Sequence, residues 1–388
     1  SAFATTVIAG FFPIFYNDFW RQGVKPAQST YELGLFNSAA GLVIALSAPL
    51  LGAIADRSGR RKIFLLGMAW MGAAATAGMF TLEANQWQMA GLLFVLGIIG
   101  FLGANIFYDS MVVDLSRGRS SDKVSALGYG MGYLGGGLLF LFNVLMVLNP
   151  ERFGLADQSE AVRLSFLSVG VWWILFSLPL AFFVKETRPA ETCGFGQAIR
   201  AGLRQLVQTF REIRLYKPVV IFLCAYWLYI DAVDTIISMA TKVGKDLGFS
   251  TNALITALLL VQFVAFPAAI AFGFLGQKMG TRKAITVALV IYTGVCLWAW
   301  QMTEEWEFYG LAVAIALVQG GVQSLSRSYY SRLIPEEKAV EFFGFYNMLG
   351  KFAALLGPVL VGTVGMMTNR TQDGVLALTV MLVGGGIL

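Results

Sequence analysis

The sequence predicts an all-α membrane protein with twelve transmembrane helices in two pseudo-symmetric six-helix bundles. Three observations support this fold class: the composition is apolar, apolar segments of membrane-spanning length recur, and one basic loop occurs twice. Of the 388 residues, 57% are hydrophobic and 13% are charged, and the mean hydropathy is +0.69. Ordinary globular domains have roughly 25% charged residues, so the composition excludes a typical soluble domain.

Twelve apolar segments account for most of the chain. A helix of about 20 apolar residues crosses the roughly 30 Å hydrocarbon core of a bilayer and satisfies its own backbone hydrogen bonds. The first segment begins and the last one stops inside an apolar run, so we expect the first and last helices to be truncated. The predicted segments are 1–18, 31–51, 63–80, 88–112, 124–148, 164–184, 218–240, 252–274, 285–302, 308–330, 342–367 and 374–388.

The basic residues give the orientation of these segments. Of the 28 Lys and Arg residues, 19 lie in alternate loops, beginning with the loop between the second and third segments, and only 7 lie in the opposite loops. Positive loops stay in the cytoplasm, so both termini are predicted to be cytoplasmic. The net charge of +5 then reflects membrane topology, and no nucleic-acid partner is expected.

The longest connection divides the chain into the predicted domains 1–184, 185–217 and 218–388. The first and third are the six-helix bundles. The second is a cytosolic linker whose apolar residues recur at helical spacing, which predicts an amphipathic helix at the membrane interface. These apolar residues are Ile199, Leu203, Leu206, Phe210 and Ile213. The three cysteines show no metal-ligand spacing, the chain has no histidine, and no metal or cofactor is expected.

The basic loop at 52–62 reads Gly-x-x-x-Asp-x-x-Gly-Arg-Arg-Lys, and a weaker copy follows 221 residues later at 273–283. Glycines permit a tight turn, and a carboxylate is stabilised near a helix N-terminus. We expect the arginines to pair with Asp114 in a cytoplasmic latch, and the second copy, with Gln277 in place of Asp56, to latch more weakly. The alternative is that the charges only fix topology. The predicted latch residues are Gly52, Asp56, Arg57, Gly59, Arg60, Arg61 and Asp114.

This loop and the twelve segments resemble the major facilitator superfamily of transporters. A narrower resemblance covers most of the chain: the stretches 1–13, 231–237, 258–267 and 341–354 are similar to bacterial relatives of the autophagy-related vacuolar amino-acid effluxer family. The superfamily resemblance implies that segments 1, 4, 7 and 10 line a central cavity, flanked by segments 2, 5, 8 and 11.

Polar residues within the apolar segments form stripes at helical spacing, where the resemblance places a cavity. Polar residues inside a membrane are costly and mark functional sites by default, and residues four apart share one helix face. They therefore form the predicted substrate site, although the same charges could merely hold helices together. The candidates are Asn105, Tyr108, Asp109, Trp227, Asp231, Asp234, Gln262, Gln319, Gln323, Arg327, Asn347 and Lys351.

The charged candidates have distinct expected roles. Lys351, about ten residues into its segment and so roughly 15 Å deep, is expected to meet a substrate carboxylate. Arg327 and Asp109 lie nearer the cytoplasm, where they suit an inward gate as well as they suit substrate contact. Three acids face two bases, and a carboxylate in low dielectric without a cation takes up a proton more readily. Asp231 and Asp234 are therefore the proton-coupling candidates.

These features predict a secondary active transporter that works by alternating access, and no enzyme. Facing acids and bases favour an amino-acid exporter with proton coupling. The open alternatives are a transporter of another small solute (an organic anion, a sugar or a drug) and, in a different class, a non-transporting membrane receptor or assembly factor. A monomer in the bacterial inner membrane is expected, with the lipid bilayer, a small-molecule substrate and protons as partners.

Overall fold

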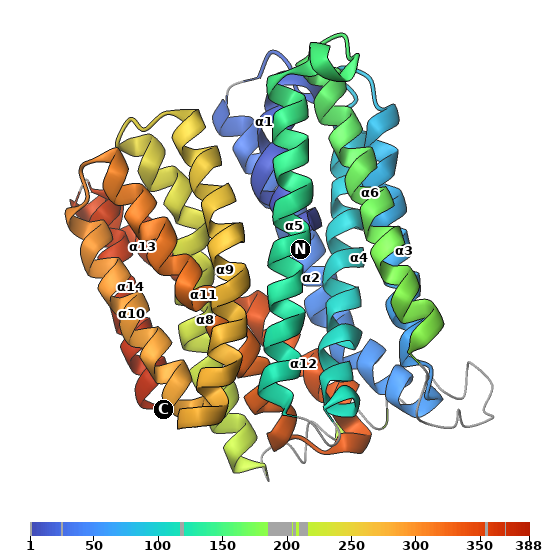
Figure 1. Cartoon of the computed structure of the whole chain (residues 1–388), viewed down its shortest axis with the longest axis vertical. Helices are drawn as coiled ribbons and strands as arrows, with labels where there is room; N and C mark the ends of the chain where they lie inside the picture. The colour runs from blue at the N-terminus through green and yellow to red at the C-terminus, as the bar shows by residue number, and fades with distance from the viewer. Residues whose placement is uncertain are drawn as a thin grey trace. The chain divides into compact units, whose positions relative to one another are not determined.

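The computed structural model describes residues 2–24, 26–116, 120–184, 204, 207–208, 216–353, 356–368 and 370–388, and these residues are almost wholly helical (Figure 1). The first predicted segment is a π-helical stretch Phe3–Phe11, a short α1 (Phe12–Phe15) and a second π-helical stretch Tyr16–Trp20. The other helices are α2 (Pro26–Ser58), α3 (Arg61–Gly78), α4 (Trp87–Leu115), α5 (Ser121–Leu148), α6 (Gln158–Phe183), α8 (Lys217–Asp246), α9 (Thr251–Met279), α10 (Thr281–Gln301), α11 (Glu305–Leu333), α12 (Ala339–Ala353), α13 (Leu356–Thr368) and α14 (Thr371–Ile387).

The predicted fold class is confirmed, and all twelve predicted segments coincide with helices. Within the described ranges, nine helices are long and apolar enough to cross a membrane, and α13 and α14 are shorter apolar helices. The eleventh segment is described as two helices, α12 and α13, on either side of residues 354 and 355, which lie outside the described residues.

The chain forms two compact units. The first comprises Ser1–Asp109 and Gly135–Leu203, and the second comprises Ser110–Leu134 and Arg204–Leu388. The helix α5 is therefore shared, with its N-terminal half in the second unit. The predicted domain boundaries stay a prediction, and the five apolar residues of the predicted amphipathic helix lie outside the described residues.

Aromatic packing and close backbone contact hold the first unit together. The rings of Phe12 and Phe94 stack with centroids 3.9 Å apart, and Trp20 stacks on Phe166 at 5.7 Å. Helices α3 and α4 touch at two glycines: a Cβ on Gly100 would lie 2.5 Å from the Cα of Gly72. Small residues at such crossings allow close packing in membranes, where the hydrophobic effect does not drive helix association.

In the second unit, glycines bring α8, α13 and α14 into direct backbone contact. A Cβ on Gly374 would meet the backbone of Val361 in α13, and a Cβ on Gly385 would lie 2.8 Å from the carbonyl oxygen of Ala225 in α8. These three helices therefore form a tightly packed group, and the position of α13 is fixed against α8.

Both copies of the basic loop contain a glycine with positive φ. Gly59 lies between α2 and α3 with φ of 66°, and Gly280 lies between α9 and α10 with φ of 92°. Positive φ is readily adopted only by glycine, which explains why both copies carry glycine at this position.

Candidate functional site

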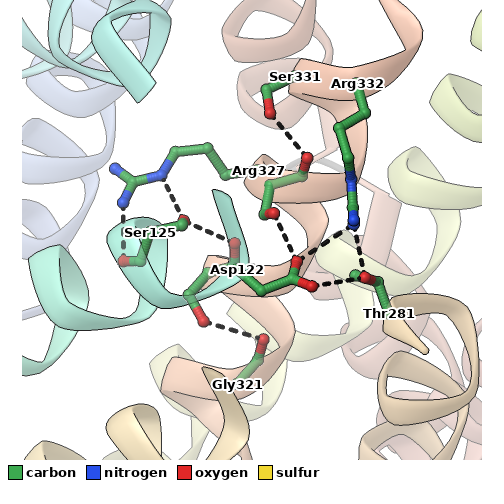
Figure 2. A network of polar contacts seen from close by, with 9 residues as sticks. Asp122, Ser125, Thr281, Gly321, Arg327, Ser331 and Arg332 are labelled. Carbon is green, nitrogen blue, oxygen red and sulfur yellow. Dashed lines mark hydrogen bonds and ion pairs between the residues drawn. The ribbon is translucent and has the colours of Figure 1, made fainter. Parts of the chain in front are cut away.

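A buried polar network joins the start of α5 to α10 and α11 within the second unit (Figure 2). Its centre is Asp122, in the first turn of α5 and only 3% exposed. One carboxylate oxygen accepts from the Ser328 hydroxyl at 2.5 Å and from Arg332 at 3.2 Å, and the other accepts from the Thr281 hydroxyl at 2.9 Å. A buried carboxylate requires such partners, so these bonds fix α5 against α10 and α11.

Arg327, a predicted site residue on α11, extends the network toward the middle of α5. Its Nε donates to the Ser125 hydroxyl at 2.8 Å and one terminal nitrogen donates to the Ser125 carbonyl at 2.9 Å. The guanidinium also lies 4.5 Å from the ring centroid of Tyr129. Arg327 is 3% exposed, so the site contains a buried, oriented cation.

The polar partners on α5 share one face of the helix. Asp122, Ser125, Tyr129 and Tyr133 are spaced by three, four and four residues, which places them in one row. The last of them, Tyr133, donates from its hydroxyl to the side-chain oxygen of Gln323 at 3.1 Å. None of these four was among the predicted site residues, although the spacing rule that identified the α11 stripe would also have identified this one.

Glycines of the second basic loop let α5 come this close. A Cβ on Gly273 would lie 2.5 Å from the Cβ of Ala126, and a Cβ on Gly276 would lie 3.4 Å from a carboxylate oxygen of Asp122. The second copy lacks an acid at the position of Asp56, and Asp122 from α5 brings a carboxylate to Thr281, within that loop. The glycines of this copy thus serve helix packing as well as turning.

Tyrosine rings on α8, α11 and α12 form an aromatic cluster beside this network. Tyr346 stacks on Tyr226 with centroids 4.1 Å apart and on Tyr330 at 5.0 Å. The hydroxyl of Tyr229 lies 2.6 Å from that of Ser326 on α11. The cluster gives the site an amphipathic wall, because each ring offers an apolar face and a polar edge. It was not predicted.

The two predicted acids of α8 have different surroundings. Asp231 is fully buried: both carboxylate oxygens accept from the backbone N–H of Gly357 in α13, each at 3.0 Å, and one accepts from the Thr235 hydroxyl at 3.3 Å. Asp234 is only partly buried.

The remaining predicted substrate residues are divided between the two units. Asn105, Tyr108 and Asp109 lie on α4 in the first unit, with Tyr108 40% exposed and Asp109 buried. The gate pair of Asp109 with Arg327 stays a prediction. The second unit contains a buried Gln262, half-buried Trp227, Gln319 and Asn347, and Lys351 on α12, whose side chain lies outside the described residues. The amide of Asn347 donates to the Phe343 carbonyl of its own helix at 3.0 Å.

The first basic loop contains a local ion pair. Arg61, the first residue of α3, pairs with Asp56 near the end of α2, and their side chains are 7% and 1% exposed. Lys62 donates to the carbonyl oxygen of Val184, at the end of α6, at 2.9 Å. Asp56 thus holds the loop's own arginine at the start of α3. The predicted pairing of this loop with Asp114 stays a prediction, and the side chain of Arg57 lies outside the described residues.

The polar groups of the second unit suit contact with a polar solute: they include a buried cation, carboxylates, amides and aromatic faces. Within the described ranges no group of His, Cys, Asp and Glu residues is arranged to hold a metal ion. The fold is that of the major facilitator superfamily. The xylose–proton symporter XylE superposes with a TM-score of 0.71, covering 100% of this chain and 91% of that one at 17% identity. The human organic anion transporter MFSD10 superposes with a TM-score of 0.67, covering 94% and 85% at 18% identity.

The family follows from sequence comparison. The chain matches the family described as vacuole effluxer Atg22-like over residues 34–119 and 113–388, and it belongs to this family. It is 35% identical to the MFS-type transporter YxiO of Bacillus subtilis, over 100% of this chain and 91% of YxiO. It is 27% identical to autophagy-related protein 22 of Eremothecium gossypii, over 81% of this chain and 66% of that relative, so it spans about two thirds of the fungal protein. The protein is a membrane transporter of the major facilitator superfamily.

Proposed function

We propose that this protein exports amino acids by secondary active transport. The observation that carries the proposal is the presence of opposite charges in one helical unit: the buried guanidinium of Arg327 on α11 and the carboxylates of Asp231 and Asp234 on α8. An amino acid carries one charge of each sign, and desolvated charges need partners. The family description as effluxers supports the outward direction of transport.

Alternating access requires contacts that can form and break, and the Asp122 network suits this role. It joins α5, from the first six segments along the chain, to α10 and α11 from the last six. Its bonds are individually modest, about 1.5–3 kcal/mol for a hydrogen bond to a charged group, so they could be exchanged for water within a transport cycle. We propose that this network closes the cytoplasmic side and opens when solute enters from the cytoplasm.

Proton coupling is the second part of the proposal, and Asp231 and Asp234 are its candidates. With no histidine in the chain, a relay in the membrane interior must use carboxylates. In proteoliposomes with an imposed pH gradient, the proposal predicts that solute accumulates against its concentration and that the D231N/D234N double variant does not accumulate it. A double variant whose transport retains the wild-type pH dependence would eliminate proton coupling through these acids.

We further propose that the protein acts as a monomer in the bacterial inner membrane, with both termini in the cytoplasm. The excess of Lys and Arg in alternate loops supports this orientation. The presence of both helical sets within one chain supports the monomer.

Two alternatives remain open beside this proposal. An organic-anion carrier would use Arg327 and Lys351 but not the acids, and the superposition on an organic anion transporter makes it the first to test. A non-transporting membrane receptor would bind solute without flux. The receptor alternative gives the repeated basic loop no role, because a protein that does not change conformation needs no matching loops in its two halves.

The deciding experiment is counterflow of a radiolabelled amino-acid panel in proteoliposomes. The proposal predicts exchange of a few amino acids, and its loss in Lys351→Ala and Arg327→Ala. Arg282→Ala is the matched control, because this arginine is exposed at the start of α10. Absence of exchange across the panel, from protein shown to be folded, would refute the amino-acid assignment. Exchange that survives in the Arg327 variant would refute the assigned role of Arg327.

A further inference from the structure

The acids Asp231 and Asp234 lie three residues apart on α8 and differ in burial and in contacts. Asp231 is fully buried and both of its carboxylate oxygens contact the same backbone N–H, that of Gly357. Gly357 is the second residue of α13. A buried carboxylate needs such donors, so Asp231 anchors the backbone of α13 from a neighbouring helix.

The contact between Asp231 and Gly357 leaves no room for a Cβ at this position. A Cβ on Gly357 would collide with the hydroxyl oxygen of Thr235 and would lie 2.7 Å from a carboxylate oxygen of Asp231. Thr235, one turn beyond Asp231, donates to the same carboxylate at 3.3 Å and thereby orients it. Three residues from two helices thus define one contact, which holds the start of α13 against the middle of α8.

Asp234 differs from Asp231 in exposure. It is partly exposed, whereas Asp231 is fully buried and its carboxylate accepts from Gly357 and Thr235. Of the two acids, Asp234 is therefore the one that a solute can reach.

We propose that Asp231 is a positioning residue that holds α13 in place, and that Asp234 is the acid that meets the ammonium group of the solute. The role of Asp234 rests on the proposed function, whereas the role of Asp231 does not. Solute binding then depends on Asp234, and Asp231 affects solute binding only through the position of α13.

Hydrogen–deuterium exchange of the intact protein in lipid nanodiscs tests the role of Asp231 without any solute. In Asp231→Asn and in Gly357→Ala, we expect the peptide that contains Gly357 to exchange about tenfold faster or more, because a hydrogen bond to a charged acceptor is lost or displaced. Gly362→Ala is the matched control on the same helix, since a Cβ there meets nothing within 4 Å. Wild-type exchange rates in both test variants would overturn the positioning role.

Two further variants complete the design. Thr235→Val keeps the carboxylate and removes one bond, so a smaller increase of about threefold is expected even if Asp231→Asn does not fold. In counterflow, Asp234→Asn should raise KM at least tenfold and leave the exchange of α13 unchanged, whereas Asp231→Asn should lower the maximal rate and leave KM within twofold. A tenfold rise of KM in Asp231→Asn together with an unchanged KM in Asp234→Asn would overturn the division of roles. If the wild-type protein moves no amino acid, the role of Asp234 fails with the proposed function, and the exchange data still decide the role of Asp231.

Discussion

Replacement of Asp122 by alanine should release α5 from α10 and α11. The change removes two hydrogen bonds from buried hydroxyls, those of Ser328 and Thr281, and one ion pair with Arg332. Each hydroxyl bond to a charged acceptor contributes about 1.5 kcal/mol or more. The Arg332 side chain is 46% exposed, so its ion pair contributes at most about 1 kcal/mol. The total of about 3–4 kcal/mol corresponds to a shift of about 100-fold or more in the ratio of closed to open arrangements.

Double electron–electron resonance measures this ratio directly. Spin labels at Leu127 on α5 and Arg282 on α10, both exposed, in a background without native cysteines, report the separation of the two helices. We expect a longer-distance population to appear in Asp122→Ala and only a change of about fivefold or less in Arg332→Ala. Asp157→Ala is the control, because it also removes a carboxylate hydrogen bond, but at the start of α6 in the other unit. If Arg332→Ala opened the pair as far as Asp122→Ala does, the assignment of the energy to the buried hydroxyl bonds would be wrong.

Three other predictions concern single contacts. Arg327→Lys should slow counterflow at least tenfold although the charge is kept, because lysine lacks the planar fork that binds Ser125 twice; an unchanged rate would show that charge alone matters. Gly273→Val should lower Tm in detergent, because overpacking against α5 should destabilise the protein by about 1–3 kcal/mol. Gly294→Val, where a Cβ meets open space, should leave Tm unchanged. Equal Tm values for the two variants would contradict the close contact. Arg61→Ala should lower Tm more than Arg60→Ala does, because Arg61 forms a buried ion pair whose loss costs about 3–5 kcal/mol, whereas Arg60 is exposed. The reverse order of Tm values would contradict the ion pair between Arg61 and Asp56.

The fold was predictable because hydropathy and backbone hydrogen bonding leave a lipid-embedded chain few choices. Each apolar run became a helix, and the repeated loop marked corresponding turns in the two halves. Contacts between helices were not predictable in this way. No spacing rule indicates that Asp231 accepts a hydrogen bond from the backbone of Gly357, 126 residues later in the chain.

The candidate site was predictable only in part, for a related reason. Spacing along one helix identifies which residues share a face, and it groups Gln323 with Arg327 on α11. It does not identify the partner helix, so the contact between Asp122 and Thr281, 159 residues apart, could not be inferred. The polar row on α5 follows the same spacing, and the hydrogen bonds of Ser125 and Tyr133 show that its partner is α11.

The central claim is that the site recognises a solute with one charge of each sign, and analogues test it most directly. Counterflow in proteoliposomes would compare an amino acid that the panel shows to be exchanged with its methyl ester, which lacks the carboxylate, and with its deaminated acid, which lacks the ammonium. The account predicts exchange of the amino acid and at least a tenfold slower exchange of both analogues. Exchange of the deaminated acid at the full rate would contradict it and would identify an organic-anion carrier.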